Sequence, residues 1–148
     1  KCDNIQPLVE YTFIKNYFMD QQRKNKEFII NYYNALSGVT KTRELMEKYI
    51  TDEALIGHIE YFEIVFPNYE IFVDEMTAES NRVIVKARTK GTHLGEFAGI
   101  PPTYKTVDFP FVVCYEIENE KIVSHWMLAD KMSLMEQLGV IPADSTVH

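Results

Sequence analysis

Four side chains in the C-terminal half of the sequence are suited to acid–base chemistry in a pocket: His93, His125, Trp126 and Asp130. A carboxylate at the dry end of an aromatic pocket has a raised pKa, which favours proton abstraction next to a carbonyl group. A histidine directed at the same place can donate a hydrogen bond to the oxygen that gains negative charge. We therefore take Asp130 and His93 as candidate catalytic residues, and Trp126 and His125 as candidate substrate contacts.

Each of these residues also has a structural interpretation. Asp130 comes directly before a helical pattern, and an aspartate in that position is a good N-cap, which would keep its pKa low. Trp126 shares a strand face with Asp130, where its indole can support a planar ligand or simply fill the core. His125 points to the opposite face by the same alternation and suits a surface or a subunit interface.

Other aromatic and imidazole side chains are available to line such a pocket, because the chain has nine Phe and nine Tyr. His58 lies on the apolar face of a predicted helix and can join His93 in one cavity. Tyr32, Phe66 and Phe97 complete the set of candidate substrate contacts, with Phe97 near the rim. The separations between the histidines match no metal-ligand signature, so we expect no metal and no other cofactor.

The elements that must position these residues follow from hydrophobic periodicity. Helical spacing is present over 5–19 and 28–36, with a polar hinge at 21–26 between them, and two further helices are predicted near 41–50 and 55–66. The last of these ends at Pro67, since the residue before a proline resists the helical conformation. A period of two then predicts strands near 71–78, 82–90, 106–117 and 122–129, with Pro110 at a sheet edge or bulge. A closing helix begins at Asp130 and stops near Gly139.

The segment 91–103, GTHLGEFAGIPPT, connects two of these strands and has three glycines and two prolines. Extending the alternation of the preceding strand directs His93 inward, unless a bulge at Gly91 reverses it. Helices followed by an antiparallel meander predict an α+β fold, in which a strongly curved sheet wraps around the N-terminal helices and leaves a cone-shaped cavity. We expect an N-terminal helical extension over 1–22 and one α+β domain over 23–148.

Bulk properties restrict the partners of the chain. A length of 148 residues suits one domain, and the net charge of −7, with its scattered Lys and Arg, argues against a nucleic-acid partner. No apolar run approaches the roughly 20 residues of a membrane-spanning helix. We expect a cytoplasmic protein, although the chain starts at Lys1 and an exported form stays open. Cys2 and Cys114 form no disulfide framework. The strand at 122–129 is apolar on both faces, which predicts a homodimer.

Several of these motifs occur together in one known family. The segment 91–103, the pair His125–Trp126 followed by Asp130, and the ending Gln137-Leu138-Gly139 resemble the SnoaL-like polyketide cyclases, also called ester cyclases. These proteins have the cone-shaped α+β fold of nuclear transport factor 2, which is also called cystatin-like. The resemblance spans roughly residues 24–141 and includes Val65-Phe66-Pro67-Asn68-Tyr69, which is similar to the family's Phe-Pro-Asp segment.

The resemblance implies a chemistry as well as a fold. Such cyclases close a ring by intramolecular aldol condensation without metal or cofactor, and a carboxylate moves the proton next to a carbonyl group. On the residue match, Asp130 is that carboxylate. The sequence departs from the family pattern at Tyr104, where a glycine is usual, and at Met127, where an acidic residue is common.

Three functions are therefore compatible with the sequence. The first is a cofactor-independent cyclase, or a related isomerase or lyase, that acts on a small apolar carbonyl compound. The second is a pocket that binds an apolar or aromatic metabolite without catalysis. The third is a dimeric interaction domain whose own side chains fill the cavity.

Overall fold

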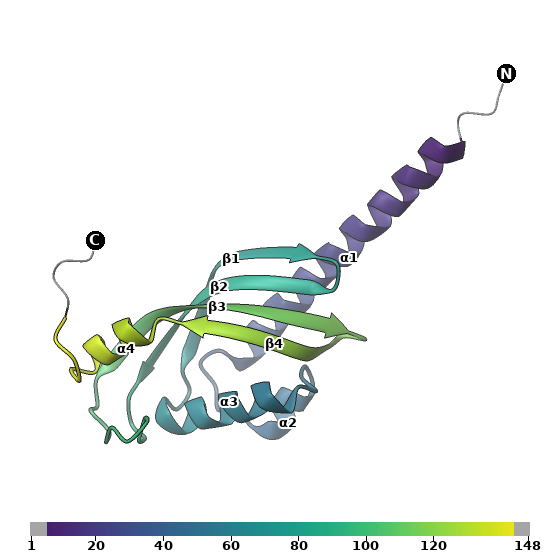
Figure 1. Cartoon of the computed structure of the whole chain (residues 1–148). Helices are drawn as coiled ribbons and strands as arrows, with labels where there is room; N and C mark the ends of the chain where they lie inside the picture. The colour runs from purple at the N-terminus through teal and green to yellow at the C-terminus, as the bar shows by residue number, and fades with distance from the viewer. Residues whose placement is uncertain (1–5, 144–148) are drawn as a thin grey trace.

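The computed structural model describes residues 6–143, with side chains from Val9 onward; Cys2 and the first residues of the predicted extension lie outside this range. The elements follow in the order α1 (Gln6–Leu36), α2 (Arg43–Glu47), α3 (Glu53–Val65), β1 (Glu70–Glu79), β2 (Arg82–Thr92), β3 (Thr106–Glu118), β4 (Lys121–Ala129) and α4 (Lys131–Gln137) (Figure 1). The order confirms the predicted α+β class, with helices first and an antiparallel meander afterwards.

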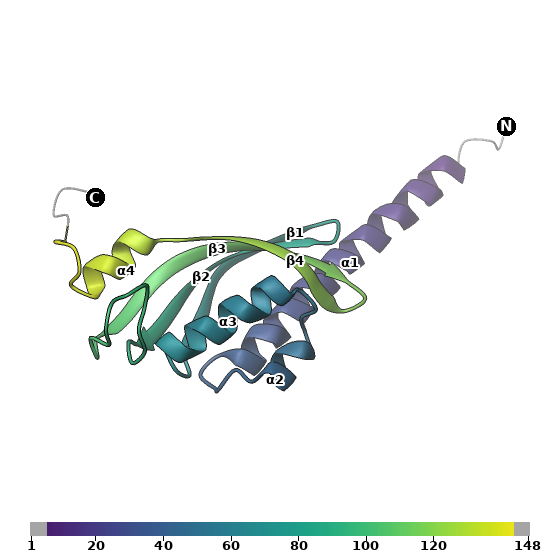
Figure 2. The same cartoon turned by 60° about the horizontal axis from the view of Figure 1, so that its bottom comes forward.

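The first helix is continuous, so the predicted hinge at 21–26 is wrong. The Gln, Arg and Lys residues of that segment are good helix formers, and Arg23 and Lys24 form ion pairs along the helix. Arg23 pairs with Glu27 and Lys24 with Asp20, each at 2.9 Å. The N-terminal part of α1 projects beyond the sheet and the C-terminal part packs beneath it (Figures 1 and 2). The expected boundary near residue 22 thus falls inside one helix.

The four strands form one antiparallel sheet in the order β1-β2-β3-β4, which leaves β4 at an edge. Figure 2 shows the sheet curving over α1, α2 and α3, which cover its concave face. The predicted irregularity at Pro110 has a simple explanation, because Pro110 pairs with Arg88 of β2 but the ladder to β4 ends at Phe111. On the β4 side the Pro110 carbonyl accepts from the Asp130 N–H at 3.0 Å, just beyond the end of the ladder, where a missing N–H group is tolerated.

The α2–α3 connection holds the edge strand β4 in place. The Lys121 ammonium group donates to the carbonyl oxygens of Glu47 and Lys48, at 2.6 and 2.8 Å. The backbone N–H of Thr51 donates to the carbonyl of Ile122 at 2.9 Å. These bonds fix the position of β4 relative to the beginning of α3, and the two elements carry several of the residues considered below.

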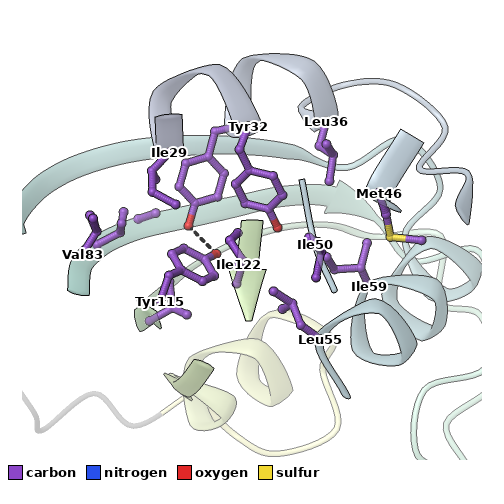
Figure 3. Packing of buried hydrophobic residues seen from close by; sticks show 14 of the residues in the cluster. Ile29, Tyr32, Leu36, Met46, Ile50, Leu55, Ile59, Val83, Tyr115 and Ile122 are labelled. Carbon is purple, nitrogen blue, oxygen red and sulfur yellow. Dashed lines mark hydrogen bonds between the residues drawn. The ribbon is translucent and has the colours of Figure 1, made fainter. Parts of the chain in front are cut away.

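The buried apolar side chains form two clusters along the concave side of the sheet. The larger cluster joins α1, α2 and α3 to the central strands and includes Tyr32, Tyr33 and Tyr115 (Figure 3). The smaller cluster lies between the end of α3, the segment after β2, β3 and α4, and includes Phe66 and Phe97. Within residues 6–143, no helix is long and apolar enough to span a membrane.

Candidate functional site

The concave side of the sheet holds an apolar cavity of about 50 Å³ beneath α1 and α3. Ala129 is the one lining residue that is exposed, so the cavity opens toward the end of β4. An engineered apolar cavity of about 150 Å³ binds benzene, so this smaller cavity admits only a few non-hydrogen atoms without side-chain movement. Its lining comes from α1, α3 and all four strands: Tyr32, Tyr33, Leu55, His58, Ile59, Phe62, Tyr69, Ile71, Thr89, Phe109, Phe111, Tyr115, Met127 and Ala129.

His58 is the only imidazole among these lining residues. It is half-buried on α3, and its ring lies against that of Phe62 with centroids 4.7 Å apart. Burial lowers the pKa of His58, and the nearby His125 and Lys131 lower it further because they disfavour a second positive charge. The ring is therefore neutral at pH 7 and can accept a proton.

His125 lies close to His58 and is held by a carboxylate that the sequence alone did not single out. Its Nδ1 is 2.7 Å from the Asp52 carboxylate, and both side chains are largely buried. Asp52 also caps α3, because its other oxygen accepts from the N–H groups of Ala54 and Leu55 at 3.0 and 3.3 Å. The N-cap pattern at the start of α3 could have identified Asp52 from the sequence. Its partner, His125, lies on β4, 73 positions later in the chain, and no local pattern connects the two.

The same strand register explains why His125 and Trp126 have opposite environments. His125 pairs with the buried Tyr115 on the concave side, whereas Trp126 pairs with Cys114 and is 49 % exposed on the outer face. The sequence correctly predicted that the two side chains point in opposite directions. However, it expected Trp126 to face the cavity, and the structure puts Trp126 outside and His125 inside.

Asp130 is exposed and directly follows Ala129 at the opening. Its side chain accepts a hydrogen bond from the Ser133 N–H at 2.9 Å and caps α4. The capping role that the sequence left open is therefore present, and Asp130 does not line the cavity.

His93 is completely buried, as the alternation of β2 predicted, but it lies outside the cavity lining. Its Nδ1 accepts from the Thr103 N–H at 3.1 Å and lies 3.0 Å from the Thr103 hydroxyl oxygen. A neutral ring then carries its proton on Nε2, which is buried and has no hydrogen-bond partner among the described residues. The ring lies against Phe66, with centroids 5.6 Å apart. His93 thus ties together the two ends of the segment 93–103.

Phe66 and Phe97 belong to the smaller core cluster and do not line the cavity. Both rings contact Phe62, with centroid distances of 5.7 and 6.2 Å. Since Phe62 itself lines the cavity, these two residues form the layer behind its wall. Of the eight residues predicted to form the site, Tyr32 and His58 line the cavity.

Sequence reasoning overlooked the hydroxyl groups in the lining. Tyr33 and Tyr115 are hydrogen-bonded to each other, with 2.7 Å between their oxygens, and both line the cavity beside Tyr32. The sequence does contain signals for this group of hydroxyls: Tyr32 and Tyr33 are adjacent in a predicted helix, and Tyr115 lies in a predicted strand. Among residues 6–143, no three His, Cys, Asp or Glu side chains are grouped so that they could hold a metal ion.

Comparison with solved structures supports the fold. AclR from Streptomyces galilaeus, a candidate hydroxylase, has a TM-score of 0.73 at 21 % identity, over 84 % of this chain and 87 % of that chain. A candidate SnoaL-like polyketide cyclase from Jannaschia sp. CCS1 has a TM-score of 0.70 at 22 % identity, over 82 % of this chain and 95 % of that chain. IdmH from Streptomyces antibioticus, a candidate polyketide cyclase, has a TM-score of 0.65 at 20 % identity, over 78 % and 98 % of the two chains.

Comparison of the sequence with curated proteins gives no significant match. The sequence model of one family, described as SnoaL-like polyketide cyclase, matches residues 34–138, which include α2, α3, all four strands and α4. This range covers most of the chain and contains nearly all the residues that line the cavity. The chain therefore belongs to the SnoaL-like polyketide cyclase family.

Proposed function

We propose that the cavity binds a small apolar carbonyl compound and catalyses a cofactor-independent, cyclase-type ring closure. The observation that carries this proposal is an apolar cavity with a neutral histidine, His58, in its wall and a carboxylate, Asp130, directly after the residue at its opening. Membership of the cyclase family supports the same reaction class. Related isomerase or lyase reactions begin with the same proton transfer.

The proposed reaction needs one base and no redox step. The base removes a proton from the carbon next to a carbonyl group, and the C–H electron pair forms the enolate. The enolate carbon then attacks a second carbonyl carbon of the same molecule, which forms the C–C bond and closes the ring. The alkoxide that results takes up the proton, so atoms and charge balance within the ligand and the base.

His58 and Asp130 are the groups that we assign to this proton transfer. His58 contacts the cavity directly and is unprotonated at neutral pH because burial lowers its pKa. Asp130 directly follows Ala129, the exposed lining residue at the opening, and this position in the chain is the reason for its assignment. General acid–base groups typically contribute 10²- to 10⁴-fold to a rate.

The test is exchange of the α-protons of small ketones in D₂O, followed by ¹H NMR with cyclopentanone, acetylacetone and 2-tetralone. His58→Gln and Asp130→Asn should each slow the protein-dependent exchange at least tenfold. Asparagine is also a good N-cap, so Asp130→Asn keeps the start of α4 intact. Asp74→Asn removes a carboxylate from β1 that is paired with Arg88, and this control should exchange like wild type.

The outcomes separate the two assignments. If only His58→Gln slows the exchange, Asp130 is a helix cap and not a base. If the wild-type protein is no faster than the double variant with any of the ketones, the proposed proton transfer is wrong.

A second candidate function, assembly of a homodimer, is favoured by the outer face of the sheet. Leu128 is 72 % exposed and Trp126 is 49 % exposed, and these neighbours on β4 form an apolar surface with Ile84 of β2. The flanking charges are paired within the chain, for example Arg82 with Glu116 at 3.1 Å. We propose this face as the dimer interface.

A further inference from the structure

Four tyrosines line the apolar cavity, and all of them except Tyr69 have rings close to one another. Tyr32 and Tyr33 come from α1 and Tyr115 from β3, and all three line the cavity. Figure 3 shows Tyr32 and Tyr115 in the same cluster, and its dashed line marks the hydrogen bond of the Tyr33–Tyr115 pair. Their rings lie 5.0 to 6.1 Å apart, centroid to centroid. Most of the other lining side chains are hydrocarbon.

The three hydroxyls have donor capacity beyond the hydrogen bond between two of them. Tyr33 and Tyr115 share one hydrogen bond, with 2.7 Å between their oxygens. The three hydroxyls carry three protons, and this bond uses one of them. The remaining O–H groups can donate to another acceptor, and a hydroxyl removed from water is stabilised when it finds one. A ligand oxygen in the cavity can supply that acceptor.

Burial is the main cause that raises the pKa of Tyr32, Tyr33 and Tyr115 above the ordinary tyrosine value. All three hydroxyls are therefore protonated at neutral pH and can donate hydrogen bonds. In a cavity with few other polar groups the local dielectric constant is low, so a hydrogen bond to an oxygen that carries negative charge is stronger than in water.

We propose that Tyr32, Tyr33 and Tyr115 form an oxyanion-binding site that holds the carbonyl oxygen of the ligand as it becomes an enolate. This inference rests on the proposed function, and it names the polar group by which the ligand is oriented. The volume of about 50 Å³ fits a carbonyl group and its neighbouring carbon atoms, with the remainder of the ligand at the opening near Ala129. The proton that His58 or Asp130 removes and the oxygen that the tyrosines bind then belong to the same ligand group.

The three hydroxyls are not required for packing alone. Phenylalanine has nearly the same shape and avoids the cost of removing a hydroxyl from water. Tyr49 provides the comparison within the same aromatic group: its ring is 5.8 Å from that of Tyr32, but it is only half-buried and does not line the cavity. Tyr49→Phe is therefore the matched control.

The experiment measures binding of 4-fluorophenol by ¹⁹F NMR, since its oxygen and adjoining carbon atoms can enter the cavity while the remainder of the ring stays at the opening near Ala129. Fluorobenzene, which has the same ring without the oxygen, is the comparison. Wild-type protein should bind 4-fluorophenol more tightly. Tyr32→Phe, Tyr33→Phe and Tyr115→Phe should each weaken 4-fluorophenol binding about twofold to twelvefold, the usual net value of one hydrogen bond, and leave fluorobenzene binding unchanged. Tyr49→Phe should change neither. Circular dichroism checks that each variant is folded, and three separate variants keep the test valid if one of them is not.

The results distinguish this inference from the proposed function. If 4-fluorophenol binds in a tyrosine-dependent way but α-proton exchange is absent, the oxyanion site stands and the cyclase proposal fails. If exchange occurs and the Phe variants change neither exchange nor binding, the oxyanion site is wrong. Equal binding of 4-fluorophenol and fluorobenzene, or no binding of either, also overturns it.

Discussion

Gly95 lies where the segment 93–103 meets the end of α3, and replacing it with alanine should destabilise the protein strongly. The N–H groups of Leu94 and Gly95 both donate to the carbonyl oxygen of Val65, at 2.9 and 3.1 Å. A Cβ atom on residue 95 would overlap the backbone carbonyl of Ile64. Backbone cannot rotate away as a long side chain can, so the whole segment must shift.

The expected loss follows from two contributions. Overpacking in a close-packed region costs about 1–3 kcal/mol, and weakening the two hydrogen bonds to Val65 costs about 0.5–1 kcal/mol for each. The free energy of unfolding should therefore fall by about 2–5 kcal/mol, a large share of the 5–15 kcal/mol that is typical of a domain. In a domain of this size, that loss lowers Tm by roughly 4–20 °C.

Gly57 is the matched control, because it is an exposed glycine inside α3 and an added Cβ meets no atom within 4 Å. Alanine is the better helix former by about 1 kcal/mol, so Gly57→Ala should stabilise the protein slightly. Urea unfolding followed by circular dichroism measures both variants. If Gly95→Ala unfolds within about 0.5 kcal/mol of wild type, the contact between the segment and α3 is not the rigid anchor described above, since surface changes commonly have effects of that size.

Two further predictions concern charge and assembly. Because the pKa of His58 is lowered from its ordinary 6.5, the unfolded chain takes up a proton first as pH falls, and stability should decrease below about pH 6.5. His58→Gln should make this decrease smaller in urea titrations between pH 5 and 8, and an unchanged pH dependence would contradict the assignment. Leu128→Lys should convert a dimer into a monomer in analytical ultracentrifugation, whereas Leu94→Lys, at another exposed leucine, should not. A wild-type protein that is monomeric at micromolar concentration would refute the dimer proposal.

Local sequence signals predicted most of the secondary structure. Asp130 caps α4, Pro67 follows the end of α3, and the alternation of β2 directs His93 inward, because each of these depends on neighbouring residues only. The one clear failure, the hinge at 21–26, came from treating a polar stretch as a break. Polar residues with i, i+4 ion pairs continue a helix as readily as apolar ones do.

Burial and long-range pairing could not be predicted in the same way. Lys41 precedes a short helix and resembles a surface residue, yet its side chain is fully buried: its ammonium group lies 2.9 Å from the carbonyl oxygen of Tyr69 and 3.3 Å from the Glu63 carboxylate. The Asp52–His125 pair joins residues 73 positions apart, and the Tyr33–Tyr115 pair joins residues 82 positions apart. Only the path of the whole chain brings such partners together.

Most of the elements, the family and the relation between neighbouring strand residues could be predicted from sequence patterns. A strand has a period of two, so His125 and Trp126 must point to opposite faces whatever the fold. Which of these faces encloses the cavity is decided by the side on which α1 and α3 pack, and that depends on contacts between distant segments. Tertiary structure therefore decides that His125 lies inside and Trp126 outside. It also brings Tyr32 and Tyr33 of α1 together with Tyr115 of β3 in one cavity wall.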